Sequence, residues 1–142
     1  MKKLIYLISV ALITVAATSS ETTADTKIIG AWKLLRFQYG KDPMQNKKQN
    51  EICIKMFTGT RWSANNYDNG TKQNGGIGGG TYTLKGDRYS ETVDYYSWDS
   101  TVCGKTFKFT MTIEDGVLHQ KGTMEWKKDS NYIIDEWYQR ID

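Results

Sequence analysis

The most suggestive chemical residue in this sequence is a glutamate within a strongly alternating segment. Within Arg88 to Tyr96, every second position carries a member of the set Tyr89, Glu91, Val93 and Tyr95. The positions between them carry small polar side chains and an aspartate. Successive side chains of a β-strand point to opposite faces, so burial of the bulkier set would place Glu91 in an apolar interior. A carboxylate there must find partners or have its pKa raised. Glu91 is therefore a candidate for fixing the polar end of a ligand or for acid–base chemistry. In the alternative interpretation it is exposed or pairs with an arginine, the candidates being Arg61, Arg88 and Arg140.

Aromatic side chains form the second candidate feature. Tyrosine and tryptophan suit sites that hold a ligand by stacking while still hydrogen-bonding, although the same side chains also fill the interiors of small barrels. Trp98 differs from the others because it falls in a predicted connection, where it could cover a site. With Glu91, the candidate ligand-binding residues are Trp62, Tyr82, Tyr95, Trp98, Phe109 and Trp137, and Trp126 belongs to the same aromatic set.

Other familiar catalytic or metal-binding patterns are missing from the sequence. His119 is the single histidine, with no second ligand or nucleophile pattern near it, so we expect a partly exposed strand residue. The glycines between Gly75 and Gly80 are not followed by the lysine and hydroxyl pair of a phosphate-binding loop. We therefore assign no catalytic residue, metal or cofactor.

Two cysteines, Cys53 and Cys103, leave one structural question open. In an exported protein a pair of cysteines can form a disulfide. The predicted strands place them across the mouth of a barrel, where a bridge requires the intervening connection to fold over the opening. A disulfide and two free thiols are both compatible with the sequence.

The first residues resemble a secretory leader. Lys2 and Lys3 precede an apolar run from Leu4 to Ala17 that ends in small residues, which predicts a signal peptide over residues 1–17, with cleavage possible up to residue 24. About 14 apolar residues are too few for a membrane span of roughly 20, so we expect no stable membrane insertion after cleavage. Residues 18–27 would be a mobile tail, and residues 28–142 the domain. We expect a bacterial protein in the periplasm or outside the cell.

The charge balance argues against a nucleic-acid partner. Without Lys2 and Lys3, the 19 basic residues of the chain become 17, against 16 acidic ones. Such a neutral surface does not predict binding to nucleic acid or to an anionic membrane.

Alternating apolar and polar residues predict an all-β domain with hairpin-length links. Phe107, Phe109, Met111 and Ile113 on one face give the clearest pattern. Eight sequential strands favour an up-and-down antiparallel barrel, because closure removes both exposed edges. The predicted strands are Ala31–Tyr39, Glu51–Phe57, Arg61–Tyr67, Gly80–Leu84, Arg88–Tyr96, Lys105–Ile113, Val117–Lys127 and Asn131–Ile141, with the glycine-rich segment Asp68–Gly79 as a loop.

The lengths of the links predict one closed end and one open end. Three short links fall on one rim, and three long ones fall on the other. A barrel with one open end is a container, and an eight-stranded barrel has room for side chains or for one small ligand.

In these features the chain resembles the lipocalin and calycin group of proteins. Gly30 and Trp32 enter the first strand, a long link follows, and Arg140 ends the last strand. The resemblance implies that Trp32 plugs the closed end and that Arg140 packs across its face as a cation–π contact. More narrowly, Phe57–Thr60 and Gly79–Tyr95 resemble a family of uncharacterised secreted lipocalin-like bacterial proteins. The helix that follows the last strand in classical lipocalins is not evident here.

The last strand cannot be oriented from its pattern. One face of this strand would carry Tyr132, Ile134, Glu136, Tyr138 and Arg140. The other face would carry Ile133, Asp135, Trp137 and Gln139, so both faces mix apolar and charged residues. The resemblance favours Arg140 near Trp32, whereas apolar size favours Trp137 inside.

The sequence thus predicts an exported barrel that binds a small hydrophobic or aromatic ligand. Two alternatives remain open. One is an enzyme that uses Glu91 in the same cavity, and the other is a packed barrel that acts through its surface in the cell envelope.

Overall fold

A computed structural model describes residues 26–126 and 129–142 of the chain. The predicted signal peptide and most of the predicted tail lie outside these residues. The elements are η1 (Thr26–Ile28), β1 (Gly30–Tyr39), β2 (Gln45–Asn46), β3 (Glu51–Phe57), β4 (Arg61–Asp68), β5 (Asn74–Lys85), β6 (Arg88–Tyr96), η2 (Ser100–Val102), β7 (Thr106–Glu114), β8 (Val117–Trp126) and β9 (Asp129–Arg140).

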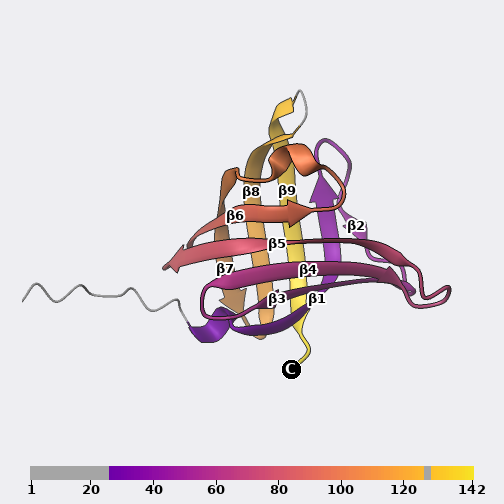
Figure 1. Ribbon diagram of the computed structural model, residues 1–142. Coiled ribbons are helices and arrows are strands. Elements are labelled where there is room, and N and C mark those ends of the chain that lie inside the picture. The colour runs from indigo at the N-terminus through magenta and orange to yellow at the C-terminus, as the bar shows by residue number, and fades with distance from the viewer. Residues whose placement is uncertain (1–25, 127–128) are drawn as a thin grey trace, which may run out of the picture.

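The strands form one closed antiparallel sheet, as predicted. β1 and β3 to β9 pair in sequence order, and β9 pairs back with β1 to complete an eight-stranded barrel. The two-residue strand β2 pairs with the second half of β1, beyond the part that pairs with β3. Figure 1 shows β8 and β9 crossing the direction of β5 and β6, as the strands of a small closed barrel do. The architecture is that of a lipocalin-like barrel.

The closed end is sealed by Trp32 and Arg140, as the resemblance implied. Trp32 is almost fully buried, and its indole N–H donates to the carbonyl of Ile28 at 2.8 Å. The guanidinium of Arg140 lies 5.3 Å from the Trp32 ring and donates to the carbonyls of Lys27 and Ile29. The chain before β1 and the end of β9 are thereby tied together at the rim that carries the short hairpins.

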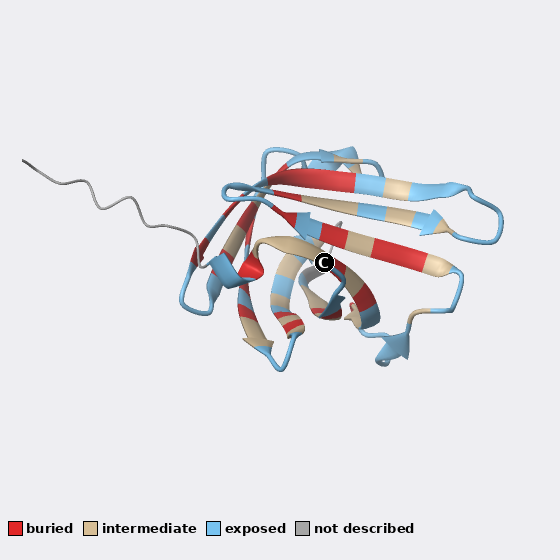
Figure 2. Cartoon of the chain, turned by 90° about the horizontal axis from the view of Figure 1, so that it is seen from below, coloured by how far each residue is buried: buried red, intermediate tan, exposed pale blue. Residues whose placement is uncertain are grey.

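The opposite rim carries the long connections. The segment between β6 and β7 folds back along β6, because Val93 exchanges backbone hydrogen bonds with Gly104 and Lys105. Its short helix η2 places the buried side chain of Val102 against the interior. Figure 2 shows how buried and less buried positions alternate along the strands, and Figure 1 shows η2 at the same end of the barrel as the start of β9.

The glycine-rich segment is a strand, so the prediction of a loop through Gly79 is wrong. β5 begins at Asn74 and runs for 12 residues. Its glycines leave room for aromatic rings, since a Cβ at Gly76 would lie 2.4 Å from the ring of Trp98, and one at Gly78 would lie 2.5 Å from Tyr96. Only residues 69–73 link β4 to β5.

A β-bulge in β6 changes which tyrosine faces the interior. Gly80 pairs with Val93 but Gly79 pairs with Tyr95, so Asp94 is the extra residue. One extra residue inverts the alternation that follows it. Tyr95 therefore points outward with 43% of its surface exposed, and Tyr96 takes the interior position. The prediction that Tyr95 faces inward is wrong for this reason.

We predict that Gly80→Ala destabilises the barrel by about 1–3 kcal/mol, as overpacking typically does. A Cβ at this position would lie 1.8 Å from the backbone carbonyl oxygen of Thr92, so the bulge would have to open. Gly59→Ala is the matched control, because a Cβ there meets nothing within 4 Å. Urea unfolding measures both variants, and equal midpoints would contradict this account of the bulge.

Candidate ligand cavity

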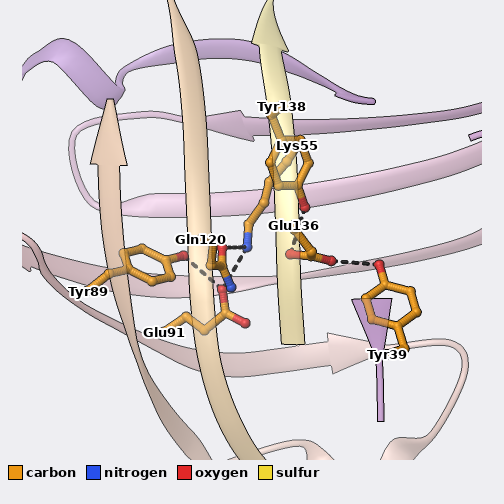
Figure 3. A network of polar contacts seen from close by, with 7 residues as sticks. All are labelled: Tyr39, Lys55, Tyr89, Glu91, Gln120, Glu136 and Tyr138. Atoms are coloured by element: carbon orange, nitrogen blue, oxygen red, sulfur yellow. Dashed lines mark hydrogen bonds and ion pairs between the residues drawn. The ribbon is translucent and has the colours of Figure 1, made fainter. Parts of the chain in front are cut away.

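A cavity of about 290 Å³ occupies the barrel between its middle and the mouth. Residues of the closed half, such as Trp32, Leu34 and Leu118, are packed into the core and do not line it. Its lining combines aromatic rings with a few polar groups, the composition that small-molecule sites share. The polar groups form two clusters, which Figure 3 shows together.

The first cluster is a buried ion pair across the middle of the barrel. The ammonium of Lys55 on β3 donates to Glu91 Oε2 on β6 at 2.9 Å and to Gln120 Oε1 on β8 at 2.8 Å. The hydroxyl of Tyr89 donates to the same Glu91 oxygen at 2.8 Å. Lys55 is 3% exposed and Glu91 8%, so neither charge is solvated as it would be on the surface. Mutual pairing and the added hydrogen bonds are what make burial of the two charges tolerable.

Aromatic faces complete the surroundings of Lys55. Its Nζ atom lies 4.8 Å from the ring of Trp62, 5.4 Å from that of Tyr89 and 5.6 Å from that of Phe57. The negative faces of these rings attract the ammonium, and the attraction grows where water is excluded. The ammonium is thus fixed on several sides at the base of the cavity.

The second cluster centres on Glu136 of β9. The hydroxyl of Tyr39 donates to Glu136 Oε1 at 2.6 Å, and that of Tyr138 donates to Oε2 at 2.9 Å. Burial, and next the nearby Glu136 charge, raise the pKa of both tyrosines well above the ordinary value. Both hydroxyls therefore stay protonated at physiological pH, and they remain hydrogen-bond donors to the carboxylate (Figure 3).

Aromatic rings surround the opening. Tyr96 packs against Trp98 with ring centroids 4.6 Å apart and edge-on to Trp126 at 6.0 Å, and Trp126 lies 6.0 Å from Tyr132. We call these four residues the aromatic rim, and all of them line the cavity. Trp98 is held in place by its indole N–H, which donates to the carbonyl of Gly75 at 2.9 Å.

Two polar atoms of the lining lack a protein partner. The indole nitrogen of Trp62 and the side-chain oxygen of Asn66 are buried, and neither is hydrogen-bonded within the described part of the chain. Unsatisfied buried polar atoms are costly, and a native structure usually gives them a water or a ligand. Both residues belong to β4 and line the cavity.

The two cysteines are free, so the disulfide left open by the sequence is not formed. Cys53 lines the cavity on β3, and Cys103 is exposed in the link between β6 and β7. Burial, followed by the Glu136 charge, raises the pKa of the Cys53 thiol to about 12. Cys53 is therefore a small apolar wall residue at neutral pH rather than a nucleophile.

Four of the predicted site residues line the cavity, namely Trp62, Glu91, Trp98 and Phe109. Tyr82, Tyr95 and Trp137 do not line it. Tyr95 points outward because of the bulge in β6. Tyr82 is buried beneath the cavity, where its hydroxyl donates to the carbonyl of Thr58 at 2.6 Å. Trp137 lies on the outer face, stacked on His119 at 3.7 Å with Arg36 4.2 Å from its ring centroid.

Sequence reasoning missed Lys55 and left Glu136 unassigned. On β3 the apolar Ile52, Ile54 and Met56 suggest that their face is the inner one, yet Cys53, Lys55 and Phe57 point inward. The available signal was Phe57, the largest residue of that strand. None of the three arginines weighed as partners of Glu91 pairs with it.

Other classes of site find no support in the described residues. Within residues 26–126 and 129–142, no three histidine, cysteine or acidic side chains are grouped to hold a metal ion. The same residues contain no helix long and apolar enough to cross a membrane.

We predict that Lys55→Met costs about 3 kcal/mol of stability, because it leaves the Glu91 carboxylate buried without its counter-ion. Adding Glu91→Gln should recover much of the loss, since the amide carries no charge. Lys48→Met is the control, because the Lys48–Glu51 pair is exposed and should contribute under about 1 kcal/mol. Urea unfolding of the unchanged protein, Lys55→Met, Glu91→Gln and the double variant gives the coupling energy, with Lys48→Met measured beside them. Additive losses in the double variant would contradict a buried ion pair.

Comparison with solved structures finds similar barrels in two Bacteroides proteins. A lipocalin-like protein from Bacteroides uniformis shares 16% identity at a TM-score of 0.53, over 80% of this chain and 98% of that one. An uncharacterised protein from Bacteroides eggerthii shares 14% identity at the same TM-score, over 80% of this chain and 99% of that one. No family model and no curated protein matches the sequence. At this identity the likeness concerns the fold, and the chain is a lipocalin-like β-barrel.

Proposed function

We propose that this protein binds one small, largely apolar or aromatic organic molecule inside its barrel. The observation that carries the proposal is the cavity itself, which lies above a sealed end, below an aromatic rim and around fixed polar groups. Similarity to lipocalin-like barrels agrees with a container but does not name its content.

The size and lining of the cavity limit the ligand. About 290 Å³ is at the small end of the roughly 300–1,000 Å³ typical of small-molecule pockets. Phe107, Phe109, Val93 and Met124 offer apolar surface between the polar clusters. A compact molecule with one or two rings and a polar end fits this arrangement better than a long lipid chain.

The two alternatives receive less support. Glu91 accepts hydrogen bonds from Lys55 and Tyr89 on one oxygen, so the carboxylate is already engaged by protein groups, and within the described residues no second catalytic group converges on it. A barrel filled by side chains would leave no space of this volume. Binding is therefore the function that the geometry favours.

We also propose that the protein is exported, with residues 1–17 removed, and acts in the periplasm or outside the cell. The support is the basic start and the short apolar run of the leader. The mass of the protein isolated from its own host would show whether these residues are removed.

We predict that the protein binds N-phenyl-1-naphthylamine, an uncharged fluorophore, at one site per chain. Ala64→Phe should weaken this binding at least about tenfold, because Ala64 lines the cavity and a phenyl ring there would occupy the ligand's space. Asn65→Phe is the matched control, since the neighbouring residue is exposed on the outer face of β4.

Fluorescence titration measures all three proteins, and circular dichroism checks that each is folded. Saturable binding that only Ala64→Phe removes would support the proposal. Equal affinities for all three proteins would refute it, as would absence of binding of this fluorophore and of the three naphthyl probes described below.

A further inference from the structure

The charges that face the cavity do not balance. Lys55 is neutralised by Glu91, with which it forms a direct ion pair. Glu136 also lines the cavity, and within the described residues no lysine or arginine is within ion-pair distance of it. The lining therefore carries one carboxylate in excess.

The partners of Glu136 in the described residues are neutral donors, which bring no positive charge to it. Tyr39 and Tyr138 each donate one hydrogen bond to it, one to each oxygen. A carboxylate has about four acceptor positions, so about two remain for another donor. Burial first, and the Glu136 charge second, raise the pKa of Cys53 and of Tyr96, which also line the cavity.

Further acceptors and aromatic faces point to the same kind of partner. Glu91 Oε2 takes both hydrogen bonds from Lys55 and Tyr89, and its second oxygen has no described donor. The buried oxygen of Asn66 is also without a donor. The aromatic rim presents π faces, which attract organic cations, most strongly where water is excluded.

We propose that the ligand is an organic ammonium ion, a protonated amine or a quaternary ammonium on a compact apolar or aromatic body, with its positive group at Glu136. This rests on the proposed function and names the class of ligand. An anionic ligand would meet an excess carboxylate and would have to compete with Glu91 and Gln120 for Lys55. A neutral ligand would leave the Glu136 charge uncompensated inside the barrel.

The test compares three probes that share one ring system and differ in charge. They are 1-naphthylmethylamine, 1-naphthylmethanol and 1-naphthoate, titrated by calorimetry into the unchanged protein at pH 7. The amine should bind at least about tenfold more tightly than the alcohol, as a charge-assisted hydrogen bond predicts, and the carboxylate should bind most weakly. This comparison decides the proposal on its own, even if a variant fails to fold.

The variant that assigns the preference is Glu136→Gln, which keeps the shape of the side chain and removes its charge. It should bring the amine and the alcohol to within about threefold of each other, a residual difference under about 1 kcal/mol. Glu114→Gln is the matched control, because Glu114 is an exposed carboxylate at the closed end. It should leave the preference unchanged.

The outcomes separate this inference from the proposed function. If the alcohol binds as tightly as the amine, or the carboxylate binds best, the cavity is a binding site but the ammonium inference is overturned. If Glu136→Gln keeps the preference for the amine, Glu136 is not its source and the inference is overturned as well. If neither these probes nor N-phenyl-1-naphthylamine bind, the proposed function fails with it.

Discussion

The interior of this barrel depends on one buried ion pair. An ammonium and a carboxylate placed midway along the barrel cannot be solvated as they would be in water, and each is tolerated because the other meets it. Lys55, Glu91 and Gln120 come from three different strands, β3, β6 and β8, so the pair also fixes how these walls face one another. Below this layer the side chains are close-packed, and above it the barrel is open.

The seal lies at the end of the barrel opposite the cavity. The contact between Trp32 and Arg140 joins the first strand to the last. The guanidinium also donates hydrogen bonds to backbone carbonyls of the segment before β1. At the mouth, the ring of Trp98 lies against the glycines of β5, and its indole N–H donates to the carbonyl of Gly75.

The two carboxylates of the cavity have different roles because their partners differ. Glu91 faces a cation, so it contributes no net charge to the cavity. Glu136, within the described residues, accepts hydrogen bonds from two tyrosine hydroxyls, which are neutral and bring no positive charge. The proposed preference for an organic cation rests on this difference between the two carboxylates.

Much of the fold could be predicted from the sequence, because period-two alternation and hairpin turns are local signals. The Phe107–Ile113 pattern is one example, and the Trp32–Arg140 contact followed from the strand order together with the resemblance to lipocalins. The prediction did less well where a local pattern is modified by distant residues. The glycines of β5 look like a loop until the rings of Trp98 and Tyr96 that fill their space are known.

The site was less predictable than the fold for a related reason. A single inserted residue, Asp94, exchanges Tyr95 for Tyr96 on the inner face, and no composition rule reveals it. Lys55 was missed because apolar residues occupy the outer face of β3. Glu91 was recognised, since it interrupts an otherwise bulky inward set, but its partner lies 36 residues away in the sequence.

Native mass spectrometry of the protein isolated from its own host tests the central claim most directly. The account predicts one bound organic molecule per chain, released on denaturation and identified as a small cation. Only bare polypeptide in repeated preparations, or a bound anion such as a fatty acid, would contradict it.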